Sequence, residues 1–239
     1  MAIRCYLAMT EAEIRRQASL PPRMGYLSCC FSPYGLGLMG VPQHLPPGNV
    51  LLLTDRIEPV HHDPVLVARQ LHAAAVRLHS AAIVLDLQRP DNIHSNRIAG
   101  AVAQGPPCPV VISQDYARDL PVGVLMRVPV GIALEDAITP WQGREMWLEM
   151  GMDRAVLEIT EQGCTRREPA PFQPDPSDLE DRDLCCRYRL ELRQDRADFC
   201  LYETVDTWQE KLRKAETLGI RNAIGLSQEF GSGFQLQHS

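Results

Sequence analysis

Short apolar runs alternate with amphipathic stretches along this chain, and the clearest example lies at residues 81–90. The sequence A-A-I-V-L-D-L-Q-R-P has three branched apolar residues in a row, a run too short for an amphipathic helix. It predicts a parallel strand that is buried on both faces. Just upstream, Asp63 and Pro64 have the pattern of an N-cap and a first-turn proline, and apolar residues follow at helical spacing. A helix followed by a strand is one α/β unit.

The same alternation recurs from end to end. We predict strands at residues 3–9, 24–31, 49–54, 81–86, 108–114 and 122–128, a seventh inside 143–163 and an eighth after Gly219. Helices are predicted after the capping box of Thr10 and Glu13, and at residues 64–79, 92–103 and 203–219. In 239 residues this pattern predicts one domain, residues 1–239, folded as a closed (β/α)8 TIM barrel of the α/β class.

Three segments interrupt the regular pattern. Residues 34–47 are rich in glycine and proline, and we expect them to form an irregular loop over the barrel mouth. Residues 143–163 read as a helix, a turn and then the seventh strand. Residues 164–204 begin with a polar, proline-rich stretch and continue with two alternating runs around R-Q-D-R-A, which predict a small hairpin insertion after the seventh strand.

Composition excludes several classes of function. The chain is 45% hydrophobic and 23% charged, and no apolar run reaches the length of a membrane span, so we expect no membrane insertion. The net charge is -6 and no basic stripe is present, so nucleic acid is not an expected partner. The first residues lack a signal-peptide pattern, which favours a cytoplasmic location, or a secreted one if a signal peptide was removed.

Metal and cofactor chemistry is not expected. The adjacent cysteine pairs at 29–30 and 185–186 lack the spacing of zinc or redox motifs, and core thiols are the simpler interpretation. Of His61, His62 and Asp63, the carboxylate is better explained as an N-cap than as a zinc ligand. No nucleotide-binding or serine-hydrolase motif is present.

Polar side chains follow the predicted strands at their carboxyl ends, where barrel sites lie. Because side chains alternate along a strand, Asp86 and Gln88 share one face. The candidate binding residues are Asp55, Glu58, Asp86, Gln88, Arg127 and Glu158. The wider rim adds Arg56, Arg89, Gln114, Asp115, Glu161, Gln228 and Glu229. Such a rim fits either a redirected pocket or a set of ion pairs that closes the mouth. Among the tryptophans, Trp147 and Trp208 lie in helix-like segments, where packing is the usual role, and only Trp141 is kept as a weak candidate for contact with a sugar.

At residues 81–90 the sequence resembles glycoside hydrolase family 18, the group of chitinases and spore-cortex hydrolases. The fourth barrel strand of that family carries D-G-x-D-x-D-x-E, and these acidic positions fall on Ala81, Val84, Asp86 and Gln88. The resemblance implies that Gln88 replaces the proton-donating glutamate. It also implies a mechanism in which the substrate's acetamido oxygen attacks the anomeric carbon, a step that an amide cannot assist by donating a proton.

Other strands depart from the same family pattern. The third strand ends at Asp55, Arg56 and Glu58 in place of a serine and paired glycines, and the sixth has Arg127 after Met126 in place of M-x-Y-D. Near the end, Tyr202, Thr207, Lys211 and the pair Gly219 and Ile220 fit the family's Y-x-x-x-x-S-x-x-x-K and G-L stretches, whereas Leu226 replaces the tryptophan on which a sugar ring stacks.

These departures favour a catalytically inactive family 18-like protein that serves as a carbohydrate-binding or interaction module. One alternative is an active hydrolase of an N-acetylglucosamine-containing glycan, with Glu58, Asp115 or Glu158 supplying the acid beside Asp86. The other is an intracellular structural or regulatory protein without sugar binding. The expected partners are therefore a glycan or oligosaccharide, or another protein. An open groove with an aromatic floor would support the sugar; a filled mouth would oppose it.

Overall fold

Eight parallel strands close into a barrel, as predicted. The computed structural model describes residues 2–35, 37–89, 91–169 and 173–230. Around the ring the strands are β1 (Arg4–Met9), β2 (Met24–Phe31), β4 (Val50–Thr54), β5 (Ala82–Asp86), β6 (Val110–Ser113), β7 (Gly123–Arg127), β8 (Met146–Met150) and β14 (Asn222–Leu226). Pairing of β1 with both β14 and β2 closes the ring. A short β3 (Leu38–Met39) pairs with β2 outside the ring.

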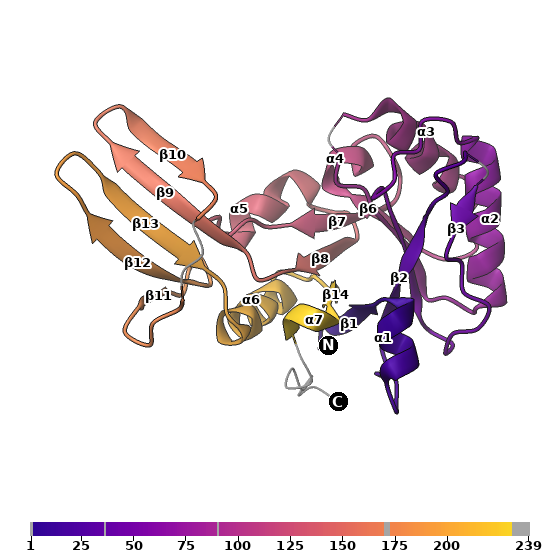
Figure 1. The fold of residues 1–239 in the computed structure, drawn as a ribbon, viewed down its shortest axis with the longest axis horizontal. Coiled ribbons are helices and arrows are strands. Elements are labelled where there is room, and N and C mark those ends of the chain that lie inside the picture. Colours follow the sequence, from indigo (N-terminus) through magenta and orange to yellow (C-terminus); the bar gives the residue numbers. More distant parts are fainter. Residues whose placement is uncertain (1, 36, 90, 170–172, 231–239) are drawn as a thin grey trace.

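Helices cover the outer wall of the barrel (Figure 1). They are α1 (Glu11–Arg16), α2 (Pro64–Arg77), α3 (Ile93–Val102), α4 (Gln114–Ala117), α5 (Leu134–Ile138), the 3-10 turn η1 (Thr139–Trp141), α6 (Val205–Thr217) and α7 (Ser227–Phe230). Two predicted caps are confirmed. Thr10 and Glu13 form a capping box, and Asp63 accepts a hydrogen bond from the backbone N–H of Val65 at 2.9 Å. No helix in the described ranges is long and apolar enough to cross a bilayer.

The glycine- and proline-rich loop after β2 lies on the outer wall and not over the mouth. Tyr26 donates its hydroxyl hydrogen to the Gly40 carbonyl at 2.8 Å, and Arg77 at the end of α2 donates to the Pro42 carbonyl at 2.8 Å. The prediction that this loop covers the mouth is therefore wrong. Its prolines prevent a helix, and its free carbonyls instead bind donors from the neighbouring wall elements.

Large side chains fill the barrel interior. Tyr6 and Trp147 stack there with ring centroids 5.3 Å apart, together with apolar residues from the other strands. Gly25 leaves them room, because a Cβ at this position would lie 2.8 Å from Leu52 Cδ1. A second, larger core lies between the strands and the helices. The barrel interior is thus packed with side chains, and a ligand could bind only at its ends.

The seventh barrel strand was predicted in the wrong place. Met146–Met150 is β8, where we expected a helix, and the predicted strand is β9 (Arg154–Thr160) of a separate sheet. In M-W-L-E-M the two outward methionines and the inward Trp147 are all apolar, so the run lacks the alternation that identifies a strand. Trp147 is therefore an interior strand residue and not a helical one.

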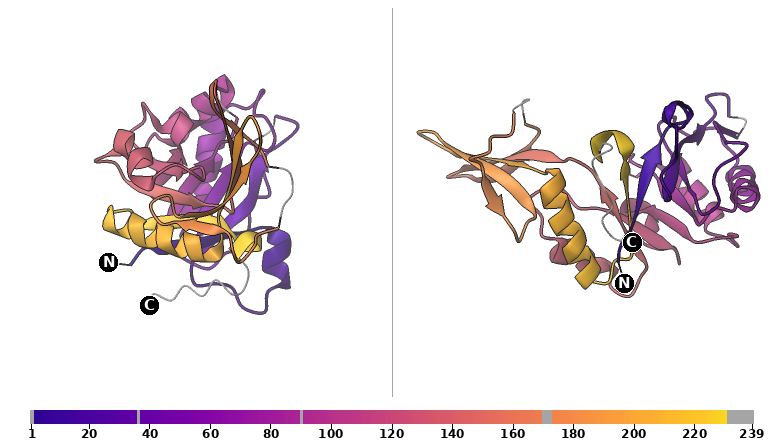
Figure 2. Two further views of the ribbon diagram at one scale, coloured as in Figure 1. Left: turned by 90° about the vertical axis from the view of Figure 1, so that its left-hand side faces the viewer. Right: turned by 90° about the horizontal axis from the view of Figure 1, so that it is seen from below.

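A five-stranded antiparallel sheet is inserted between β8 and α6. It consists of β9, β10 (Gly163–Arg167), β11 (Leu179–Asp181), β12 (Cys186–Leu192) and β13 (Ala197–Tyr202), in the order β10-β9-β13-β12-β11. The predicted hairpin corresponds to β12 and β13. The inserted sheet begins at Arg154, ten residues before the predicted position 164, and it projects away from the barrel (Figure 2).

Candidate functional site

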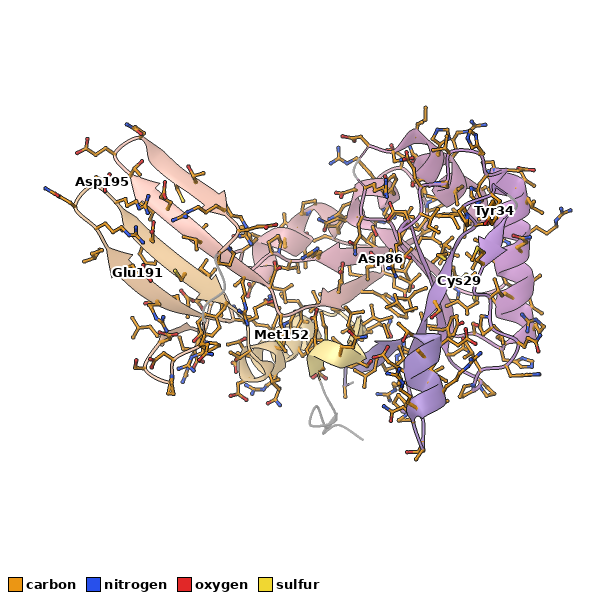
Figure 3. All side chains as sticks on the ribbon, in the orientation of Figure 1. Cys29, Tyr34, Asp86, Met152, Glu191 and Asp195 are labelled. Carbon is orange, nitrogen blue, oxygen red and sulfur yellow. The ribbon has the colours of Figure 1, made fainter. Side chains whose placement is uncertain are left out.

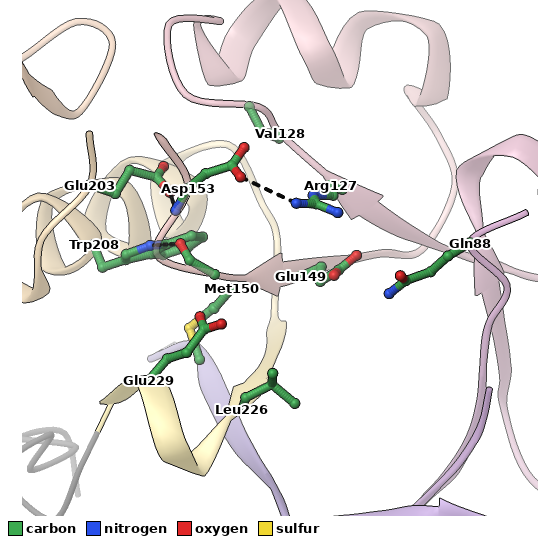
Figure 4. A pocket seen from close by; sticks show the side chains of 11 residues that line it. Gln88, Arg127, Val128, Glu149, Met150, Asp153, Glu203, Trp208, Leu226 and Glu229 are labelled. Atoms are coloured by element: carbon green, nitrogen blue, oxygen red, sulfur yellow. Dashed lines mark hydrogen bonds and ion pairs between the residues drawn. The ribbon is translucent and has the colours of Figure 1, made fainter. Parts of the chain in front are cut away.

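Polar side chains gather at the carboxyl ends of the barrel strands. Asp86 ends β5, Arg127 ends β7, and Glu149 lies opposite Arg127 in the register of β7 and β8. A cavity of about 170 Å³ opens beside them (Figure 4). Its walls are Gln88, Arg127, Val128, Glu149, Met150, Gly151, Asp153, Glu203, Trp208, Leu226 and Glu229.

Asp86 and Gln88 are in direct contact, as their shared strand face predicted. The Gln88 Nε2 amide donates to both carboxylate oxygens of Asp86, each at 3.2 Å. Burial raises the pKa of Asp86, the Gln88 hydrogen bonds and Arg127 lower it, and the nearby Asp55 carboxylate raises it. The Gln88 amide is therefore held against the Asp86 carboxylate at the edge of the cavity.

Glu149 is a site residue that the sequence did not reveal. Its position was predicted as helix, yet β8 directs it toward the mouth beside Arg127. Burial raises the pKa of Glu149 to about 7, with further increases from the charges of Asp86, Asp153 and Glu229 against the opposing effect of Arg127. Glu149 thus carries a proton over part of the neutral pH range. Predicting a strand at residues 146–150 would have revealed Glu149 as a site residue, because Trp147 and Glu149 then point to the same interior face.

Arg127 connects the mouth to the inserted sheet. Its guanidinium forms an ion pair with Asp153 at 3.2 Å, and Arg166 of β10 approaches the other Asp153 oxygen at 3.9 Å. Asp153 and Glu149 together hold the pKa of Arg127 above its ordinary value, although burial acts in the opposite direction. Arg127 is therefore positioned between two carboxylates.

The far wall of the cavity rests on a buried ion pair between Glu203 and Lys211. Both side chains are only 1% exposed. Glu203 also accepts a hydrogen bond from the backbone N–H of Asp153 at 3.1 Å, and the Lys211 ammonium lies 4.7 Å from the centre of the Trp208 ring. Burial raises the pKa of Glu203, while Lys211 lowers it. This arrangement fixes the segment that carries Asp153.

Three other predicted binding residues lie outside the cavity. Asp55 is buried below the mouth, where its carboxylate accepts the backbone N–H groups of Gln88 and Arg89, each at 3.0 Å. Glu58 pairs with Arg89 at 3.5 Å and accepts the Asn92 amide at 2.8 Å. Glu158 lies on β9, because that segment belongs to the inserted sheet, and pairs there with Arg167 and Arg196. The structure unites Asp86, Gln88 and Arg127, and separates Glu58 and Glu158 from them.

The wall of the cavity contains one aromatic side chain, and it is buried. Trp208 is 2% exposed, and its Nε1–H donates to the Gly151 carbonyl at 2.5 Å. Leu226, which also lines the cavity, is 37% exposed. Glu229 accepts the backbone N–H of Met152 at 2.8 Å. The aromatic floor that would support sugar stacking is therefore not present among the residues that line this cavity.

The histidines near α2 have structural contacts. The Nε2 atom of His62 lies 3.0 Å from the Gly37 carbonyl, and Asp63 caps the helix. Within the described ranges, no group of three or more histidine, cysteine or carboxylate side chains is arranged to hold a metal ion.

The fold and its insertion define a class of protein: a parallel (β/α)8 barrel with an antiparallel sheet inserted after the seventh strand. Solved structures of glycoside hydrolase family 18 have this fold. The family 18 chitinase of Cycas revoluta, solved with allosamidin, is 8% identical, with a TM-score of 0.55 and coverage of 93% of this chain and 94% of its own. The class V chitinase of Nicotiana tobaccum, solved with NAG4, is also 8% identical, with a TM-score of 0.55 and coverage of 94% and 93%.

The spore cortex-lytic enzyme of Bacillus cereus is 10% identical, with a TM-score of 0.53 and coverage of 94% of this chain and 70% of its own. No protein-family model and no curated protein sequence matches the chain. The resemblance to family 18 is thus confirmed for the fold.

Proposed function

We propose that this chain is a family 18-fold barrel that binds a glycan or oligosaccharide at its mouth and does not hydrolyse it by the substrate-assisted mechanism. One observation carries the proposal: Gln88, which the sequence resemblance aligns with the catalytic acid, donates its amide to both oxygens of Asp86. A neutral amide has no proton to give to a glycosidic leaving oxygen. Because a positioned acid contributes roughly 100- to 10,000-fold in rate, its loss removes a main part of that mechanism.

Binding is supported by the polar groups that remain. Arg127, Gln88 and Glu149 all line a cavity at the carboxyl ends of the strands, where (β/α)8 barrels bind their ligands. The two chitinases named above were solved with allosamidin and with NAG4. A sugar hydroxyl fits the donor and acceptor groups of this cavity, with Leu226 as the apolar contact in place of an aromatic floor.

A second candidate function rests on Glu149. An acid with a pKa of about 7, close to the Asp86 carboxylate, has the properties of a general acid for glycoside hydrolysis. This is the earlier alternative of an active hydrolase with a non-standard acid, now assigned to Glu149. Glu58, Asp115 and Glu158 were predicted for that role. Glu58 and Glu158 are held in ion pairs outside the cavity, and Asp115 does not line it.

Calorimetry and turnover assays with chitotetraose separate these functions. The proposal predicts binding to the unmodified chain without release of shorter sugars, and weaker binding after Arg127→Ala. Glu58→Gln is the matched control, because it changes a polar residue outside the cavity. Turnover that is lost in Glu149→Gln would replace the proposal with the second candidate. Absence of binding together with absence of turnover would overturn both and favour a protein that acts without sugar.

A further inference from the structure

The mouth cavity carries more carboxylates than basic side chains. Among the described residues that line it, the acidic ones are Glu149, Asp153, Glu203 and Glu229, and the basic one is Arg127. Asp86 adds a further carboxylate beside the cavity, where Gln88 donates its amide to both oxygens. The balance of these charges determines which kind of sugar the mouth can hold.

Two of the carboxylates are already paired with cations. Glu203 forms the buried ion pair with Lys211. Asp153 has the guanidinium of Arg127 at 3.2 Å and that of Arg166 at 3.9 Å. The negative charges of Asp153 and Glu203 are therefore compensated within the protein.

The other three carboxylates, those of Asp86, Glu149 and Glu229, form no ion pair within the described part of the chain. Asp86 accepts the Gln88 amide, and Glu229 accepts the backbone N–H of Met152 at 2.8 Å. These donors are neutral, so they leave both negative charges in place. Arg127 acts on Asp86 and on Glu149, but beyond the distance of an ion pair.

Glu149 lies between the other two uncompensated carboxylates and experiences both charges. In Figure 4 its carboxylate points toward Gln88, with Glu229 on the other side of the cavity. Burial raises the pKa of Glu149 to about 7, the charges of Asp86, Asp153 and Glu229 raise it further, and Arg127 lowers it. A proton on Glu149 reduces the negative charge of the mouth, and a bound cation would do the same.

We infer that the glycan bound at the mouth is an amino sugar with a free ammonium group, which binds against Glu149 within the field of Asp86 and Glu229. An ammonium has three N–H donors and no acceptor, so it complements ionised carboxylates, which only accept. Hydrogen bonds between such charged partners are roughly twice as strong as those between neutral ones. The inference rests on the glycan-binding function proposed above and names the class of sugar.

Other ligands of the same region match it less well. An N-acetylated sugar offers a neutral amide, which leaves the charges of Asp86, Glu149 and Glu229 uncompensated, and an anionic sugar would be repelled. Within the described ranges, no group of three or more carboxylate, histidine or cysteine side chains is arranged to hold a metal ion. The carboxylates are therefore too dispersed for a metal site, whereas an ammonium on a sugar ring can bind beside one of them.

Calorimetry at pH 6 with two matched sugars tests the inference. Chitotetraose and the glucosamine tetramer differ only in their acetyl groups, and we expect the glucosamine tetramer to bind about tenfold more tightly. Glu149→Gln should reduce this preference to less than about threefold. Asp195→Asn is the charge-matched control, because Figure 3 shows Asp195 at the far end of the inserted sheet, away from Asp86. A thermal melt establishes that both variants are folded.

Proton release supplies a second readout. An ammonium beside Glu149 favours its ionised form, so binding of the glucosamine tetramer at pH 6 should expel a proton from this carboxyl. Titrations in two buffers with different heats of ionisation measure that release. Chitotetraose should show none, and Glu149→Gln should remove most of the release that the glucosamine tetramer causes.

Three outcomes would overturn the inference, and they have different consequences for the proposed function. If the unmodified chain binds chitotetraose as tightly as the glucosamine tetramer, the mouth binds a glycan but does not select an amino group. If neither sugar binds, glycan binding is overturned as well. If the peptide Gly-Lys-Gly binds as tightly as the glucosamine tetramer, the mouth selects an ammonium without a sugar.

Discussion

Gln88 donates its side-chain amide to both carboxylate oxygens of Asp86, with N–O distances of 3.2 Å. Asp86 is the last residue of β5, and Gln88 lies two residues beyond it. The sequence resemblance aligns these two positions with an aspartate and the catalytic acid of family 18. Here the second residue is a fixed donor to the first. The contact holds the Asp86 carboxyl, whose pKa is raised by burial, in a defined orientation at the mouth.

Gln88→Glu should restore the glutamate of the family motif without restoring glycoside hydrolysis. The change replaces a donor with a second carboxylate, so at pH 8 we expect the free energy of unfolding to fall by about 1 kcal/mol, through lost hydrogen bonds and like-charge repulsion. At pH 4 the loss should largely disappear, because protonation removes the repulsion. Urea denaturation at the two pH values measures this difference. If the variant is as stable as the unmodified protein at pH 8, the hydrogen bonds between Gln88 and Asp86 do not stabilise the fold.

Glu149 should make the stability of the protein depend on pH. Its pKa is about 7 in the folded state and 4.5 as a free side chain, so between these values the folded state binds more protons than the unfolded state. The stabilising contribution is complete below pH 4.5 and is lost as the pH rises through 7. Glu149→Gln mimics the protonated form at every pH. It should therefore raise the free energy of unfolding at pH 8 by roughly 2 kcal/mol, after an allowance for solvent screening, and leave it unchanged at pH 4.

Glu58→Gln is the control for that series. Glu58 is half-exposed and paired with Arg89 at 3.5 Å, outside the cavity. Its variant should follow the pH profile of the unmodified protein. If Glu149→Gln raises the free energy of unfolding at pH 8 no more than Glu58→Gln does, the neighbouring carboxylates and burial do not destabilise the ionised Glu149.

Asp55 and Glu58 were predicted together as binding residues, and their variants should now differ. Asp55 accepts two backbone N–H groups that follow β5, so Asp55→Ala leaves both donors unpaired and should cost roughly 2 kcal/mol of unfolding free energy. Glu58→Ala removes an exposed ion pair, worth less than about 1 kcal/mol. Denaturation curves at one pH compare them directly. Equal losses would show that the turn after β5 does not depend on the Asp55 carboxylate.

The barrel could be predicted because most of its strands are recognisable from their local sequence alone. Ala82–Asp86 is an unbroken apolar run, and Asp63 before Pro64 is a helix start that requires no tertiary information. The seventh strand could not be recognised from its local sequence. Met146–Met150 is apolar on its outer face and partly polar inside, since Glu149 faces the mouth. The polar Glu149 in this run thus interrupted the apolar pattern from which a strand is predicted.

The sequence predicted only those site residues that lie at the ends of correctly predicted strands. Asp86 ends β5 and Gln88 follows two residues later, so their side chains meet, and Arg127 approaches Asp86 because the carboxyl ends of the strands converge. Glu203 and Lys211 required knowledge of where the chain returns after the inserted sheet. Glu158 was misplaced because β9 was taken for a barrel strand. Long-range placement, and not residue type, was the missing information.

Lys211→Met tests whether the buried ion pair supports the cavity wall. Removing the ammonium leaves the Glu203 carboxylate buried beside Trp208 with no opposite charge, and an uncompensated buried charge costs about 3–5 kcal/mol. The double variant Glu203→Gln, Lys211→Met removes both charges and keeps similar volumes. The double variant should therefore be more stable than Lys211→Met alone, even though it carries one more substitution. Urea denaturation at pH 7 measures both. If the double variant is less stable than Lys211→Met, the Glu203 carboxylate is not left uncompensated, and the segment that carries Asp153 must be held by other contacts.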